Sequence, residues 1–110
     1  MSITSGDNIE LEGNTLNAEV DKYYVFEELT SDVIVMFPSE TSTSKIEGFI
    51  IYVPIPTSSI GSISFNGNGN DIYENGLSDI EEDKIYEINC LWNGVVWAVT
   101  AIELIQYSQV

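Results

Sequence analysis

The sequence predicts an all-β protein: a single antiparallel β-sandwich or jelly-roll-like domain of about eight strands over residues 1–110. Three observations favour this fold class. Short apolar runs are separated by turn residues at the spacing typical of sandwiches and jelly rolls. Gly13-Asn14 and Asn93-Gly94 are two-residue hairpin turn signals, each between runs that alternate with a period of two. No segment has a convincing helical period over ten or more residues.

The first expected element is a hairpin around Gly13-Asn14. With that pair as the loop, the apolar residues of both strands share one face and the polar residues share the other. The expected apolar pairs are Leu11 with Leu16 and Ile9 with Ala18. This separation of the two faces favours a β-ribbon with one side turned inward.

Two strand-like runs follow the hairpin. Residues 23–29 are rich in β-forming residues and end at a turn over residues 30–32. Residues 33–37 are short, apolar and largely β-branched, which is typical of a strand covered on both faces. Pro38 is expected to end this second strand.

The middle of the chain predicts two more strands and one long connection. Residues 46–53 are aromatic and β-branched, and they should stop at Pro54-Ile55-Pro56 because two prolines so close cannot donate to a ladder. Residues 60–65 form another short strand. Residues 66–83, rich in Gly, Asn and Asp, are expected to be irregular.

The last third of the chain predicts a long hairpin whose register follows from its turn. With Asn93-Gly94 as a type I′ loop, four apolar pairs fall on one face. These pairs are Trp92 with Val95, Cys90 with Trp97, Ile88 with Val99, and Tyr86 with Ala101. Lys84 falls opposite Glu103, which predicts a cross-strand ion pair at the open end. A slip by one residue would turn polar residues towards the core, so this facing is well specified.

The composition removes most catalytic chemistry. The chain has no histidine and no arginine, and its three basic residues are Lys22, Lys45 and Lys84. Without histidine there is no general base with an ordinary pKa near neutrality, and the commonest metal ligand is missing. A glycosidase built on two carboxylates remains possible, because the chain has 18 acids. We therefore expect no enzymatic activity, no catalytic residues and no cofactor.

Two further residue patterns predict no site. Cys90 is the only cysteine, so no intrachain disulfide can form, and its place on the apolar face predicts a buried, inert thiol. The Asn-Gly repeat of residues 66–71 has oxygen ligands of the kind calcium prefers, but it lacks the acids of an EF-hand loop at their required positions. We expect a flexible loop there and no metal.

The net charge of −15 limits the possible partners. It argues against binding to nucleic acid or to an anionic membrane, since both need positive charge on the protein. It is compatible with a basic protein partner or with mimicry of nucleic acid. The N-terminus has no apolar signal segment, and the longest apolar runs are too short to span a bilayer, so synthesis in a cytoplasm is expected.

Residues 48–70 carry no charge at all. An acidic protein can use such a segment as a subunit interface, and the candidate interface residues are Phe49, Ile50, Ile51, Val53 and Ile55. The alternative is that these residues belong to the central strands of the core. The tyrosines at positions 52, 73 and 107 are not placed by the pattern, and an exposed pair of them could stack on a sugar ring.

The order of the motifs resembles a small β-sandwich module found in virion proteins of tailed bacteriophages. The resemblance spans residues 9–104 and is carried by strand and turn patterns, with no catalytic signature. The carrying segments are residues 13–16, 22–26, 33–38, 63–65, 84–88 and 92–97. Such modules occur at tail-fibre tips and as capsid auxiliary or head-fibre proteins. The resemblance implies a place on the virion surface, reached from the host cytoplasm during assembly, and an oligomeric habit, with a trimer favoured.

The expected function is therefore a non-enzymatic structural or decorating component of a phage particle. It would act by docking on a larger virion structural protein and by self-association. Because the chain starts almost directly with its first strand, a free-standing component is favoured over a complete tail fibre. The alternatives are a carbohydrate-binding or adhesin module and an acidic nucleic-acid mimic that inhibits a host enzyme.

Overall fold

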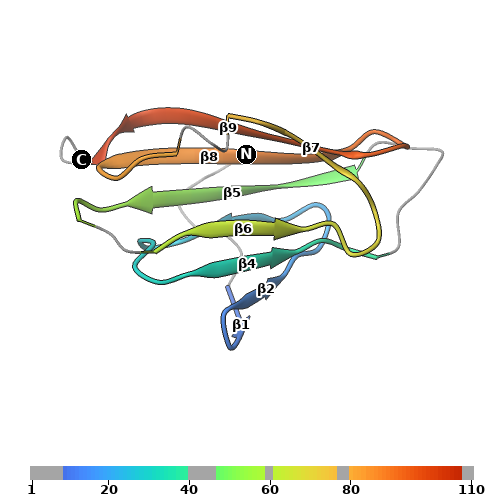
Figure 1. Ribbon diagram of the computed structural model, residues 1–110, viewed down its shortest axis with the longest axis horizontal. Helices are drawn as coiled ribbons and strands as arrows, with labels where there is room; N and C mark the ends of the chain where they lie inside the picture. The colour runs from blue at the N-terminus through green and yellow to red at the C-terminus, as the bar shows by residue number, and fades with distance from the viewer. Residues whose placement is uncertain (1–8, 40–46, 59–60, 77–79, 108–110) are drawn as a thin grey trace.

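The computed structural model describes residues 9–39, 47–58, 61–76 and 80–107, and these form nine β-strands in two sheets and no α-helix (Figure 1). The strands are β1 Leu11–Glu12, β2 Thr15–Asn17, β3 Tyr23–Val25, β4 Val33–Met36, β5 Glu47–Ile55, β6 Ile63–Asn66, β7 Ile72–Asn75, β8 Lys84–Trp92 and β9 Trp97–Gln106. The prediction of an all-β sandwich is confirmed.

The two sheets face each other as layers. One has four strands in the order β1-β2-β4-β6, and the other has five in the order β3-β5-β8-β9-β7. Figure 1 shows the long strands β5, β8 and β9 in one layer, with β2, β4 and β6 in the other. The expectation of purely antiparallel sheets is wrong, because β2-β4, β3-β5, β4-β6 and β7-β9 pair in parallel.

The mixed pairing has a simple cause in the path of the chain. From β2 to β7, successive strands alternate between the two sheets. Each crossing reverses the chain, so two crossings bring it back to the first sheet in its original direction. The pairs β2-β4, β3-β5 and β4-β6 therefore become parallel neighbours. β7 and β9 are parallel for another reason, because the chain reverses twice within the five-stranded sheet, on entering and on leaving β8. Only β1-β2, β5-β8 and β8-β9 are antiparallel.

The core fills the space between the two sheets with side chains from alternate strand positions. Phe37 is its aromatic centre, and its ring contacts Phe49, Phe65 and Trp97 at centroid distances of 5.3, 5.8 and 4.8 Å. All three contacts are edge-to-face, the arrangement that aromatic quadrupoles prefer. Trp97 is fully buried. The two layers are thus joined by one aromatic cluster.

Strand β5 runs two residues further than expected and contains Pro54. In a strand, the N–H and C=O of one residue point to the same side. The Pro54 carbonyl accepts a hydrogen bond from the amide of Leu29 at 2.8 Å, on the side where β3 has already ended at Val25. Proline lacks only the N–H on that side, so the pairing with β8 is unaffected.

The C-terminal hairpin has the predicted faces but a register shifted by two residues. Trp92 pairs with Trp97, Cys90 with Val99 and Ile88 with Ala101. The connection thus covers residues 93–96, and Val95, expected on the apolar face, is 76% exposed at the turn. Because the shift is by an even number of residues, the side chains of the hairpin other than Val95 remain on their expected faces.

The other strand predictions are partly confirmed. Leu11 pairs with Leu16 as expected, although Leu11 is 41% exposed. The run over residues 23–29 is a strand only to Val25, and β4 has its alternate side chains buried, not both sets. The strand β7 lies in the segment expected to be irregular. Residues 46 and 60 lie outside the described part of the chain.

Candidate docking surface

The outer face of the five-stranded sheet is crossed by four rows of residues that are partners in the strand register. From β3 or β5 towards β7, the rows are Gly48-Leu91-Ala98-Tyr73, Tyr23-Ile50-Asn89-Thr100-Asn75, Val25-Tyr52-Glu87-Ile102 and Pro54-Ile85-Ile105. We call these residues the outer face. They alternate with the core residues of the same strands.

The outer face carries a single formal charge, on Glu87, although Asp, Glu, Lys and Arg make up 19% of the chain. An antiparallel sheet with one solvated side normally turns polar side chains outward. Here the outward positions of β5 are Gly48, Ile50, Tyr52 and Pro54, so this strand is apolar on both sides. Its outward side is therefore less polar than a solvated sheet face usually is, and Pro54 on that side is already buried within the chain.

The one carboxylate of the outer face has a hydrogen-bond partner. Tyr23 Oη donates to Glu87 Oε2 at 3.0 Å, between strands β3 and β8 across β5. Burial of the Tyr23 ring, and secondly the bond to Glu87, raise the pKa of Tyr23 to about 12. The hydrogen bond holds the carboxylate against the face.

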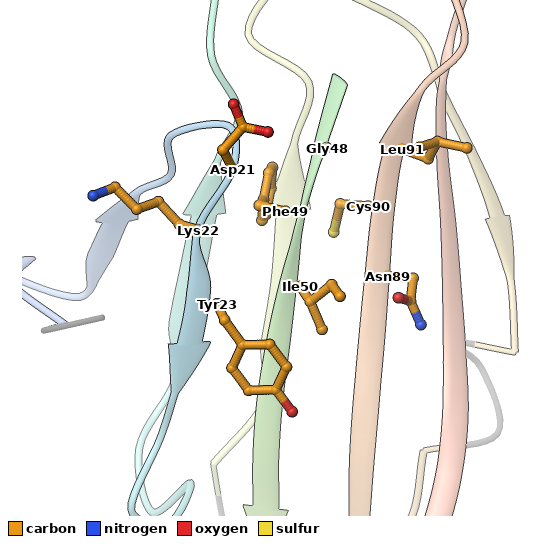
Figure 2. Close-up of a pocket in the computed structure, with 9 residues that line it drawn as sticks. All are labelled: Asp21, Lys22, Tyr23, Gly48, Phe49, Ile50, Asn89, Cys90 and Leu91. Carbon is orange, nitrogen blue, oxygen red and sulfur yellow. The ribbon is translucent and has the colours of Figure 1, made fainter. Parts of the chain in front are cut away.

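A hollow of about 550 Å³ lies on the outer face beside Gly48 (Figure 2). Its lining comes from three neighbouring strands and the residues just before β3: Asp21, Lys22, Tyr23, Gly48, Phe49, Ile50, Asn89, Cys90 and Leu91. A Cβ atom at position 48 would stand 2.6 Å from the Cys90 carbonyl oxygen, which is too close for any residue but glycine. The absence of a side chain at position 48 leaves this part of the face open.

The expected interface residues separate onto the two sides of β5. Phe49, Ile51, Val53 and Ile55 are buried in the core, so they offer no surface for a partner. Ile50 is the exception, since it lies on the outer face between Tyr23 and Asn89. The physical reason is the period of two in a strand, which cannot turn consecutive residues to the same side.

The sequence interpretation missed the partners of Ile50 on the other strands. Leu91, Ala98 and Ile102 are outward residues of the C-terminal hairpin, and Leu91 and Ile102 are each 44% exposed. A signal was present: the outward set of that hairpin holds few charges, as does the outward set of β5. Combining the two sets required the β5-β8 pairing, which no turn signal gives.

The three unplaced tyrosines lie in different settings. Tyr52 is half-buried on the outer face, whereas Tyr73 is 69% exposed on β7. Tyr107 follows β9, and its hydroxyl donates to Glu28 Oε2 at 2.8 Å. That bond is the first cause that raises the pKa of Tyr107. Only Tyr73 therefore offers a largely open ring.

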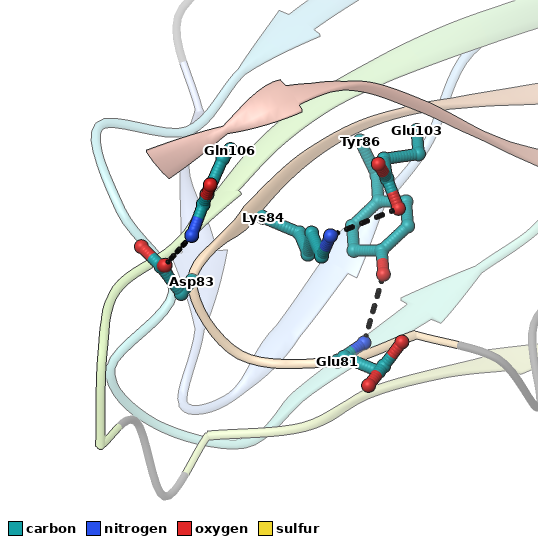
Figure 3. A network of polar contacts seen from close by, with 6 residues as sticks. All are labelled: Glu81, Asp83, Lys84, Tyr86, Glu103 and Gln106. Carbon is teal, nitrogen blue, oxygen red and sulfur yellow. Dashed lines mark hydrogen bonds and ion pairs between the residues drawn. The ribbon is translucent and has the colours of Figure 1, made fainter. Parts of the chain in front are cut away.

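A polar network fastens the opposite end of the C-terminal hairpin (Figure 3). The predicted ion pair is present, with Lys84 Nζ 3.4 Å from Glu103 Oε1, although Lys84 pairs with Gln106 along the strands. A bulge at Leu104 accounts for the change of register. Gln106 donates to Asp83 Oδ2 at 2.6 Å. These contacts hold the strand ends together.

Cys90 and the Asn-Gly loop, the two other patterns singled out in the sequence, are both engaged in the structure. Cys90 is buried and burial raises the pKa of its thiol, so the thiolate needed for reaction is disfavoured. Asn66 Oδ1 accepts a hydrogen bond from the Asn68 amide within the loop, and Asn68 Nδ2 donates to the carbonyl oxygen of Phe37, after β4. Across the described ranges, no group of three or more His, Cys, Asp or Glu residues is placed to hold a metal ion.

Comparisons with known proteins leave the family of this chain open. No family model, no curated protein and no solved structure matches it. Among the described residues, no helix has the length and apolar character needed to cross a membrane.

Proposed function

We propose that this protein is a non-enzymatic structural or decorating component of a phage particle, and that it acts by docking through the outer face. The supporting observation is the outer face itself, which has four rows of residues with one charge, in a chain of net charge −15. Interface centres are depleted in charge and enriched in aromatic residues, and those of homodimers are more apolar than the rest of the surface. The setting on a virion rests on the sequence resemblance alone.

The proposal accounts for the chemistry around the face. A rigid two-layer sandwich holds Ile50, Leu91 and Ala98 on neighbouring strands, so little conformational entropy is lost when they are covered. The chain lacks histidine and arginine, and its one thiol is buried. Binding is the activity that such a surface supports.

The test is mass spectrometry of phage particles purified from the source of this sequence. The chain should be present in a fixed ratio to the capsid or tail proteins. Leu91→Glu should be excluded from the particles, whereas Leu11→Glu should be incorporated normally. Leu11 is the matched control for Leu91, because the two leucines are similarly exposed, at 41% and 44%, and lie on different sheets. A chain that is abundant in the lysate and missing from the particles would contradict the proposal.

A glycan-binding role is a second candidate, favoured by one specific observation. Tyr73 is 69% exposed, and Asn75 and Thr100 stand in the next row of the outer face. An open aromatic ring beside amide and hydroxyl groups suits a neutral sugar. If this candidate is right, the parent protein binds a glycan on an array, and the Tyr73→Ala variant does not. Salt-sensitive capture of a basic host protein would favour the nucleic-acid mimic instead.

A further inference from the structure

We infer that the occupant of the outer face is a second copy of this chain, packed face to face about a two-fold axis. This inference rests on the proposed function, since it names the partner of the same surface. Three features of the outer face carry it: its charge, its size and its relief.

Charge decides where two copies can meet. Each copy has a net charge of −15, so most mutual orientations bring carboxylates together. The outer face is the exception, because its one carboxylate, Glu87, already accepts a hydrogen bond from Tyr23. The hollow beside it has two charged lining residues of opposite sign, Asp21 and Lys22. Self-association through this face buries few like charges. It should become tighter as salt screens the repulsion between the rest of the two molecules.

The size of the face suits a weak dimer. Pro54 and Ile85 of the fourth row are already buried within the chain, so the first three rows form the part that a second copy can cover. With about 3.4 Å per residue along a strand and about 4.8 Å between strands, these three rows cover roughly 400 Å² in projection. A standard protein interface buries about 800 Å² of accessible surface per partner, so the contact is a small one. Concentration-dependent dimerisation is the expected behaviour.

The relief of the face is self-complementary. The half-exposed Leu91 side chain stands at the edge of the hollow beside Gly48. A two-fold axis through this region places the leucine of each copy over the hollow of the other, and both contacts form together. The same operation consumes both outer faces, so assembly stops at the dimer. This stoichiometry differs from the trimer that the phage resemblance implies.

The test is sedimentation equilibrium of the purified chain over a hundredfold range of concentration, at low and high salt. The expected mass rises from 12.2 kDa towards twice that value, and the dissociation constant falls as salt increases. Leu91→Glu and Leu91→Arg should each weaken the dimer at least tenfold, because either charge would lose water in a hollow lined mainly by apolar residues, with Asp21 and Lys22 as its charged members. Leu11→Glu should dimerise like the parent chain. Circular dichroism confirms that each variant is folded.

The possible outcomes separate the inference from the proposed function. A parent chain that stays monomeric at the highest concentration overturns the inference. So does a trimer, or a dimer that all three variants form equally well. If the chain is monomeric and Leu91→Glu is still excluded from particles, the outer face docks on another protein, and only the proposed function survives. If the dimer forms and the particles lack the chain, the proposed function fails and the dimer stands.

Discussion

Trp92 lies directly opposite Trp97 across the β8-β9 hairpin, and their ring centroids are 5.7 Å apart at an interplanar angle of 52°. Both indoles are buried, so the aromatic contact closes the end of the core next to the turn. This pairing differs by two residues from the register predicted with Asn93-Gly94 as a two-residue loop. Four residues, 93–96, connect the strands instead.

The turn depends on the side chain of Asn93. Its Oδ1 accepts from the amides of Val95 and Val96, each at 2.9 Å. We expect Asn93→Ala to lower the free energy of unfolding by about 1 kcal/mol, because two turn amides lose their protein acceptor. Asn93→Asp keeps the acceptor and should cost less. Urea denaturation of the three proteins measures the difference, and equal midpoints for Asn93→Ala and the parent would contradict the assignment.

The aromatic cluster predicts a large effect at Phe37. This ring contacts three other aromatic rings and is 1% exposed. Phe37→Ala should destabilise the protein by about 3–5 kcal/mol through lost burial and the cavity left behind. The neighbouring Met36 points away from the core, so Met36→Ala is the matched control and should cost far less. Thermal and urea unfolding measure both variants; similar losses would place Phe37 outside the core.

Tyr23 predicts a stability change in alkaline solution. Its pKa is raised to about 12 in the folded protein from 10.0, so the neutral phenol is favoured by folding. This contribution is complete below pH 10 and is lost as the pH rises through about 12. Tyr23→Phe should therefore show a smaller fall of the unfolding free energy between these pH values. Tyr73→Phe, on an exposed ring, should follow the parent curve. A Tyr23→Phe curve parallel to that of the parent would argue against the buried phenol.

Cys90 predicts slow thiol chemistry in the native protein. The side chain is 2% exposed, and burial raises its pKa, so a disulfide reagent finds little thiolate. Labelling should be at least a hundredfold slower in buffer than in denaturant at the same pH. The labelling rate is measured with an aromatic disulfide reagent, from the absorbance of the thiolate that it releases on reaction with Cys90. Rapid native labelling would show that the core opens locally at β8.

The fold was largely predictable from local signals, and the docking surface was not. The turn at Gly13-Asn14 fixed the β1-β2 register, and the period of two placed Trp92 and Trp97 on one face. The strand β7 escaped because its four residues stand among Gly, Asn and Asp, and its partner β9 lies over twenty residues later in the chain.

The candidate site escaped for a related reason. Ile50 and Leu91 share the outer face through the pairing of β5 with β8. Local propensity describes each strand and says little about which strands become neighbours. The charge-free composition of residues 48–70 did indicate an unusual surface, but it could not say which alternate residues face outward. That choice followed once the sheet order placed Phe49 against Phe37.

The alternation of the strands between the two sheets has a consequence for biosynthesis. β5 ends at Ile55 and needs β8 as a neighbour, and β8 begins only at Lys84. A nascent chain therefore emerges from the ribosome with β5 paired on its β3 side alone until β8 has been made. Sheets built on such distant pairings close in milliseconds to seconds, not microseconds. During that interval the excess of acidic over basic residues keeps unfinished chains apart, so the acidity that restrains assembly of the finished protein also protects its synthesis.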